Sequence, residues 1–134
     1  MTALVAIVTV LVLMFYIWTL MGVGRARTKH GIDAPIMTGP IEFESTVRVQ
    51  ANTLEGMVIF LPAMWLFAAY VNSVIAALLG LVWIAGRYLY MQGYIRAPKE
   101  RHTGFMIQAV ATVVALLGGL IGAVVSLFTG GAAT

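Results

Sequence analysis

Cysteine is absent from this sequence of 134 residues, and charged residues are scarce. Without cysteine the chain can form neither a disulfide nor a thiolate metal site, and it has no cysteine nucleophile. The two histidines, His30 and His102, have no metal-ligand spacing, and the sequence carries no glycine-rich phosphate-binding motif. We therefore expect no bound metal.

Charged residues make up only 10% of the chain, whereas 61% of the residues are hydrophobic. A soluble domain carries about a quarter charged residues. The net charge of +3 is modest and forms no basic stripe, so we expect no nucleic-acid partner. The composition predicts one small integral membrane domain over residues 1–134 with no separate soluble part.

Four apolar segments are each long enough to cross a bilayer, which takes about 20 residues. A polar loop with two prolines follows the first segment, a break at Asn72 and Ser73 follows the second, and a basic stretch with Pro98 follows the third. The sequence predicts an all-α, integral membrane four-helix bundle. Its helices are expected at about residues 2–27, 45–70, 74–95 and 104–128.

Basic residues gather in the two loops that would share one side of the membrane. They are Arg25, Arg27, Lys29, Arg96, Lys99 and Arg101. The positive-inside rule places these loops in the cytoplasm and both termini outside. Short loops favour a bacterial inner membrane, and an endoplasmic-reticulum membrane stays an alternative.

A polar stripe interrupts the second apolar segment near its start. Its residues are Arg48, Gln50, Asn52, Thr53 and Glu55. Arg48, Asn52 and Glu55 stand at i, i+4 and i+7, which places them on one helix face. Charged residues at membrane depth are costly and mark a functional site by default. The stripe therefore predicts a polar ligand pocket between helices.

The third segment supplies a second stripe at the same membrane end. Arg87, Tyr90 and Tyr94 stand at i, i+3 and i+7, with Gln92 and Arg96 nearby. Arginine binds carboxylates and stays charged when partly buried, and amides pair with amide groups. We expect the two stripes to form a pocket for an anionic, peptide-like ligand, in which Glu55 accepts from a ligand ammonium or neutralises an arginine.

Structural interpretations of the same residues stay open at this point. Arg48 and Glu55 could form an internal ion pair that fixes helix packing, and Tyr90 and Tyr94 could belong to an interfacial aromatic belt. Small residues in the last segment could serve packing within the chain or between subunits. They are Ala115, Gly118, Gly119, Gly122 and Ala123.

Two longer motifs carry a family resemblance. The stretches TGPIEFESTVRVQANTLE and GRYLYMQGYIRAPKER contain E-x-x-x-R-x-Q-x-N-x-x-E and R-x-x-Y-x-Q-G-Y-x-R. They resemble the membrane-associated proteins in eicosanoid and glutathione metabolism (MAPEG), and the resemblance covers essentially the whole chain. The pattern is most similar to the cysteinyl-leukotriene synthase and microsomal glutathione transferase branches of the family.

This resemblance implies a homotrimer with glutathione held between neighbouring subunits near the cytoplasmic face. The glutathione-binding residues it implies are Arg27, Arg48, Gln50, Asn52, Glu55, Arg87, Tyr90 and Tyr94. The arginine that activates the thiol corresponds to Arg101. The chain departs from the family pattern at Thr28, where a second arginine can occur, and at Gly56, where a tyrosine is frequent.

The implied activity is conjugation of the glutathione thiolate, as co-substrate, to a lipophilic electrophile from the bilayer, a detoxification reaction that could extend to hydroperoxide reduction. A non-catalytic scaffold that binds lipids or fatty acids is the alternative, because the family includes such members. Charges confined to one membrane end do not describe a transport path, so a transporter or channel is a weaker third reading.

Overall fold

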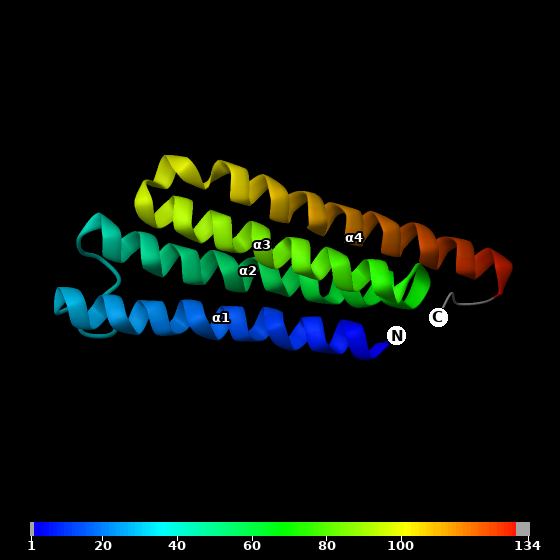
Figure 1. Cartoon of the computed structure of the whole chain (residues 1–134), viewed down its shortest axis with the longest axis horizontal. Helices are drawn as coiled ribbons and strands as arrows, with labels where there is room; N and C mark the ends of the chain where they lie inside the picture. Colours follow the sequence, from blue (N-terminus) through cyan, green and yellow to red (C-terminus); the bar gives the residue numbers. More distant parts are fainter. Residues whose placement is uncertain (1, 131–134) are drawn as a thin grey trace.

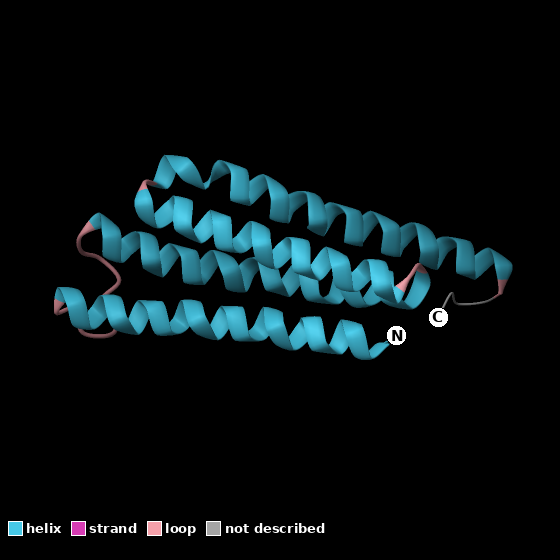
Figure 2. Cartoon of the chain, viewed as in Figure 1, coloured by secondary structure: helices cyan, strands magenta, loops and turns pink. Residues whose placement is uncertain are grey.

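Four long helices make up nearly all of the computed structural model, which describes residues 2–130. They are α1 (Thr2–His30), α2 (Ile41–Tyr70), α3 (Ser73–Arg96) and α4 (His102–Thr129), with a short 3₁₀ helix, η1 (Pro98–Arg101), before α4. No strand occurs in this range (Figure 2). All four helices are long and apolar enough to cross a membrane. The predicted membrane four-helix bundle is confirmed.

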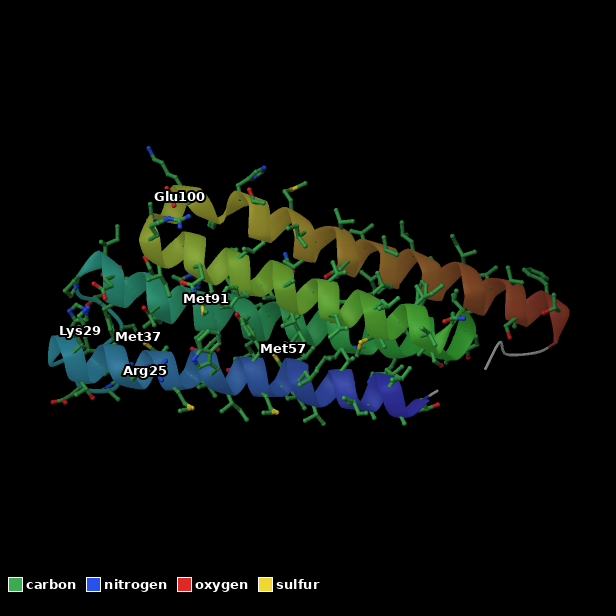
Figure 3. All side chains as sticks on the ribbon, in the orientation of Figure 1. Arg25, Lys29, Met37, Met57, Met91 and Glu100 are labelled. Carbon is green, nitrogen blue, oxygen red and sulfur yellow. The ribbon has the colours of Figure 1, made fainter. Side chains whose placement is uncertain are left out.

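The helices run alternately up and down, with α1 and α4 on opposite sides of the α2 and α3 pair (Figure 1). The start of α1, the α2–α3 turn and the end of α4 lie at one end of the bundle, and both charged loops lie at the other. Figure 3 shows Lys29, Met37 and Glu100 at this second end, which we call the loop end.

Local contacts explain where the helices begin and end. Helix α2 begins at Ile41, four residues before the expected Ser45. The Glu44 carboxylate accepts the Gly39 N–H at 3.0 Å, which ties the first turn of α2 to the loop before it. At the opposite end of the bundle, the Asn72 side chain caps α3 by accepting the Ile75 N–H at 2.9 Å.

The core lies between the four helices, and its largest side chains come from α1, α2 and α3. Phe60 of α2 and Trp83 of α3 are fully buried and stack with their ring centroids 5.2 Å apart. Val12 of α1 and Met64 of α2 are also fully buried in this cluster. Because two helices contribute the stacked rings, this contact fixes the depth of α2 relative to α3.

Glycines bring the backbone of α4 close to its neighbours. A Cβ on Gly104 would meet the backbone N and Cα of Tyr90, and one on Gly86 would lie 2.7 Å from the backbone N of Gln108. Near the other end of α4, a Cβ on Gly122 would lie 2.6 Å from the Tyr70 carbonyl oxygen. These close approaches fix the register of α4, and they show that small residues of α4 serve packing within the chain.

The outer faces of α1 and α4 are apolar and exposed in the single chain. Examples are Ile7 and Met14 on α1, and Leu120, Ile121 and Phe128 on α4. An exposed apolar surface of this extent suits contact with lipid or with further membrane helices.

Candidate functional site

A cleft of about 460 Å³ opens between α2, α3 and α4 on the loop-end half of the bundle. Five of the nine predicted site residues line it: Asn52, Glu55, Arg87, Tyr90 and Arg101. The remaining lining residues are Gly56, Ile59, Phe105, Gln108, Ala109, Thr112 and Val113. Met57, the neighbour of Gly56, lies near the middle of the bundle in Figure 3. The cleft therefore reaches from the charged end towards the middle of the membrane span.

A hydrogen-bonded chain joins the polar stripes of α2 and α3. Arg48 donates to Asn52 Oδ1 at 3.0 Å, and Asn52 donates through Nδ2 to the Tyr90 hydroxyl oxygen at 2.6 Å. The i to i+4 spacing on α2 brings Arg48 beside Asn52. As a result, the phenol of Tyr90 is held at the cleft wall with its own O–H proton available to a ligand.

Arg87 is buried in the cleft wall, with 3% of its surface exposed. Its Nη2 donates to the Thr53 hydroxyl at 2.8 Å, and its guanidinium lies 4.2 Å from the centroid of the Tyr90 ring. Its Nε has no hydrogen-bond partner among the described residues. Within residues 2–130 no carboxylate lies at ion-pair distance from it. A buried guanidinium in this position is costly, so this part of the cleft favours an anionic ligand.

Arg101 stands at the mouth of the cleft, where η1 meets α4. Its Nη1 donates to the Pro98 carbonyl oxygen, and its guanidinium lies 5.4 Å from the centroid of the Tyr94 ring. Tyr94 in turn packs edge-on against Tyr90, with ring centroids 5.5 Å apart. The tyrosines thus separate the exposed Arg101 from the buried Arg87.

Four predicted residues do not line this cleft. Arg48 reaches it only through Asn52, and Tyr94 only through its packing against Tyr90 and Arg101. Gln50 faces α1, where its Nε2 donates to the Tyr16 hydroxyl oxygen at 2.7 Å. Arg27 donates to the Ile36 carbonyl oxygen at 2.7 Å, beside the loop after α1. Within a single chain, Arg27 and Gln50 therefore lie away from the cleft.

The ion pairs within residues 2–130 lie away from the cleft. Lys29 pairs with Glu42 at 2.7 Å, and Arg96 pairs with Glu100. Neither Arg48 nor Glu55 takes part in an ion pair in this range, so the internal pair that their residue types allow is not formed. No group of three or more His, Asp and Glu side chains in the described part of the chain could hold a metal ion.

Sequence reasoning missed the α4 wall of the cleft. Gln108 is 7% exposed there, and Thr112 stands one turn further along with its hydroxyl donating to the Gln108 carbonyl oxygen at 2.8 Å. A signal was available, because Gln108 is the only amide side chain between His102 and Thr129. The wall thus adds two polar groups to an otherwise apolar surface.

The fold and the cleft define a class: a membrane protein of four helices with an arginine-rich cleft at one membrane end. The sequence model of the MAPEG family matches residues 5–121, and the chain belongs to this family.

Known relatives agree with this assignment. Microsomal glutathione S-transferase 2 of Mus musculus is 44% identical over 100 residues, which cover 72% of this chain and 68% of the relative. Leukotriene C4 synthase of Cavia porcellus is 38% identical over 99 residues, which cover 74% of this chain and 66% of the relative. An uncharacterized protein of Synechocystis sp. is 44% identical over 116 residues, covering 87% and 85%. These similarities support a glutathione-dependent, transferase-type function at the level of the family.

Proposed function

We propose that this protein is a membrane-bound glutathione S-transferase that conjugates the glutathione thiolate to lipophilic electrophiles. One observation carries the proposal: the buried Arg87, which forms no ion pair within residues 2–130, lies in the same cleft as Arg101, Asn52 and Tyr90. Two guanidinium groups with an amide and a phenol suit a small anionic peptide. Membership of the MAPEG family supports glutathione as that peptide.

Binding of glutathione would use the cleft residues in distinct roles. Arg87 would face a carboxylate, because its Nε donor lacks a partner. Asn52 and Tyr90 would pair with peptide groups, and Arg48 would support Asn52 through their 3.0 Å hydrogen bond. Glu55, the one acidic side chain among the described residues that line the cleft, would accept from the glutathione ammonium. Tyr94 would hold Arg101 over its ring.

Arg101 would stabilise the thiolate. A free thiol has a pKa of about 8.5, so little thiolate exists at neutral pH. A guanidinium beside the sulfur favours the anion, but arginine does not deprotonate and cannot serve as the base. The thiol proton would therefore leave to solvent, which reaches the exposed Arg101 at the cleft mouth. The thiolate sulfur then forms a bond to the electrophilic carbon, and the leaving group departs or the adduct takes up a proton.

A homotrimer would complete the site. Gln50 and Arg27 lie on the α1 side of the chain, away from the cleft that holds Arg87 and Arg101. Both could contact glutathione if the α1 side of a neighbouring subunit covers this cleft. The exposed apolar faces of α1 and α4 supply surface for such an assembly and for the surrounding lipids.

The second substrate would enter from the bilayer. Ile59, Phe105 and Val113 form an apolar part of the cleft that Arg101 also lines. A lipophilic electrophile dissolved in the membrane could bind there without crossing water. A lipid hydroperoxide would be an alternative substrate: two glutathione molecules would be oxidised to the disulfide, and the hydroperoxide reduced to an alcohol and water.

We place the charged loops in the cytoplasm and both termini outside, in a bacterial inner membrane.

Conjugate formation by the detergent-purified protein tests the proposed activity. We expect mass spectrometry to detect the thioether of glutathione and a lipophilic electrophile such as an alkyl iodide, at a rate well above the uncatalysed one. Arg96→Ala, which removes an arginine paired with Glu100 outside the cleft, serves as the matched control and should keep the activity. Binding of fatty acids without any thioether would support the lipid-binding scaffold instead.

Co-expression tests the shared site. Arg27→Ala and Arg101→Ala subunits should each be inactive alone. When the two are mixed and assemble at random, about a quarter of the sites should combine an intact Arg27 from one subunit with an intact Arg101 from its neighbour, and these sites should be active. Failure of the mixture to regain activity would show that Arg27 and Arg101 do not act across a subunit boundary.

A further inference from the structure

Gln108 lies at a junction of three helices, inside the membrane-spanning part of α4. A Cβ on Gly86 of α3 would lie 2.7 Å from its backbone N, so α3 packs directly against the Gln108 backbone. A Cβ on Gly56 of α2 would lie 3.9 Å from its side-chain Oε1. The two glycines thus fix the Gln108 backbone on one side and leave room for its carboxamide on the other.

The carboxamide has spare hydrogen-bonding capacity at the cleft. Its Nε2 donates to the Phe105 carbonyl oxygen of its own helix at 3.1 Å. An amide nitrogen carries two N–H donors, and this bond uses one of them. The neighbouring Thr112 hydroxyl is engaged with the Gln108 backbone carbonyl at 2.8 Å. Gln108 is therefore the group of the α4 wall that has a donor to offer to a bound molecule.

Helical geometry places this donor within reach of the thiolate site. Arg101 and Gln108 are seven residues apart, which corresponds to about 10 Å along the helix axis. Both residues line the same cleft, and the Gln108 carboxamide reaches back along α4 in the direction of Arg101, because its Nε2 donates to the Phe105 carbonyl oxygen. A short electrophile bound between them would have its reacting carbon near Arg101 and a polar group near Gln108.

We propose that Gln108 binds the carbonyl oxygen of a conjugated enal or enone and selects this class of lipophilic electrophile. This inference rests on the proposed function. The thiolate sulfur forms a bond to the β-carbon, and the carbon–carbon π electrons move to give an enolate. Its negative charge develops on the carbonyl oxygen, where the Gln108 N–H stabilises it. A proton from solvent then adds to the α-carbon, so that the product is the saturated thioether.

A buried donor aimed at a developing oxyanion is worth much more in an apolar site than in water. Phe105, Ala109 and Val113 make the rest of the α4 wall apolar apart from Thr112, whose hydroxyl already donates to the Gln108 carbonyl oxygen. An alkyl halide, by contrast, reacts without placing charge on an oxygen, so Gln108 gives it no advantage.

The test compares kcat/KM of the full-length protein for 2-nonenal and for 1-iodononane, each with glutathione. In Gln108→Leu, which keeps the side-chain size and removes the donors, we expect a loss of about 100-fold for the enal. The kcat/KM for the iodide and the absorbance of the glutathione thiolate should both stay within about twofold of those of the unaltered protein. Thr112→Val is the matched control in the same wall and should leave the ratio of the two substrates unchanged.

The outcomes separate this inference from the proposed function. Equal losses for both substrates, or no loss for either, would overturn the role of Gln108 while conjugation itself stands. Absence of turnover and of the thiolate band in the unaltered protein would overturn both. If Gln108→Leu does not fold, Gln108→Asn takes its place, because it keeps an amide on a side chain shorter by one methylene. For the inference to hold, this variant must lower the ratio of kcat/KM for the enal to kcat/KM for the iodide.

Discussion

Asn52 of α2 and Tyr90 of α3 are joined by a hydrogen bond of 2.6 Å from the Asn52 Nδ2 to the Tyr90 hydroxyl oxygen. Arg48 donates to the other end of the same amide. This contact orients both side chains at the cleft wall, and it links the two polar stripes that the sequence shows separately.

Tyr90→Phe removes the hydroxyl from this contact and leaves the ring under Arg87. A hydrogen bond of this kind contributes about 1 kcal/mol, so we expect the dissociation constant for glutathione to rise about fivefold. Isothermal titration in detergent measures the change. Tyr88→Phe, which alters an exposed tyrosine outside the cleft, should bind glutathione as the unaltered protein does. Equal affinities for Tyr90→Phe and the unaltered protein would contradict the role of this contact.

Arg87→Met removes a buried charge and fills its space with an apolar chain. Because no carboxylate of the described residues forms an ion pair with Arg87, we expect the melting temperature in detergent to stay the same or rise. The rise in melting temperature that saturating glutathione produces should be largely lost, since the ligand carboxylate loses its partner. Arg96→Met, an exposed arginine on the same helix, should keep that rise. A less stable variant with full stabilisation by glutathione would show that Arg87 is structural.

Gly104→Ala tests the close approach of α4 to α3. The added Cβ would meet the backbone N and Cα of Tyr90, which cannot move aside as a flexible side chain could. We expect a loss of stability of about 1–3 kcal/mol, measured by thermal or denaturant unfolding in detergent. Gly24→Ala is the control, because a Cβ there meets no atom within 4 Å. The account of the α3–α4 contact is wrong if both variants unfold alike.

Gly56 determines how much of the cleft is open. A Cβ there would lie 3.4 Å from Trp83 Cζ2, an ordinary contact, so Gly56→Ala should have little effect. Gly56→Phe should fill the apolar part of the cleft and lower kcat/KM for a long-chain electrophile about tenfold or more. The thiolate band should be unchanged, since the arginines are untouched. Unchanged rates with long-chain substrates in Gly56→Phe would place the electrophile elsewhere.

Much of the fold follows from the sequence. The length of each apolar segment shows that it can cross the membrane as a helix, and Asn72 and the loop prolines mark where one helix ends and the next begins. The early start of α2 was harder to foresee, since it depends on the Glu44 carboxylate binding the Gly39 N–H. That contact needs the three-dimensional path of the loop.

The site was predicted in part. Arg48, Asn52 and Glu55 share a face by their spacing, but Gln50 is two residues from Arg48, or about 200° around the helix. It therefore faces α1 and Tyr16. Gln108 belongs to the cleft only because Gly86 and Gly104 bring α4 against α3, a packing that no single-helix pattern reveals.

Ultraviolet difference absorbance of the detergent-purified protein with glutathione tests most directly whether Arg101 stabilises the thiolate. We predict a thiolate band at saturating glutathione that is half-developed at a pH below about 8.5, the pKa of a free thiol. In Arg101→Ala the band should require higher pH while glutathione still binds, and Lys99→Ala, another cation of η1, should leave it unchanged. A band that persists unaltered in Arg101→Ala, or its absence from the unaltered protein, would contradict the account.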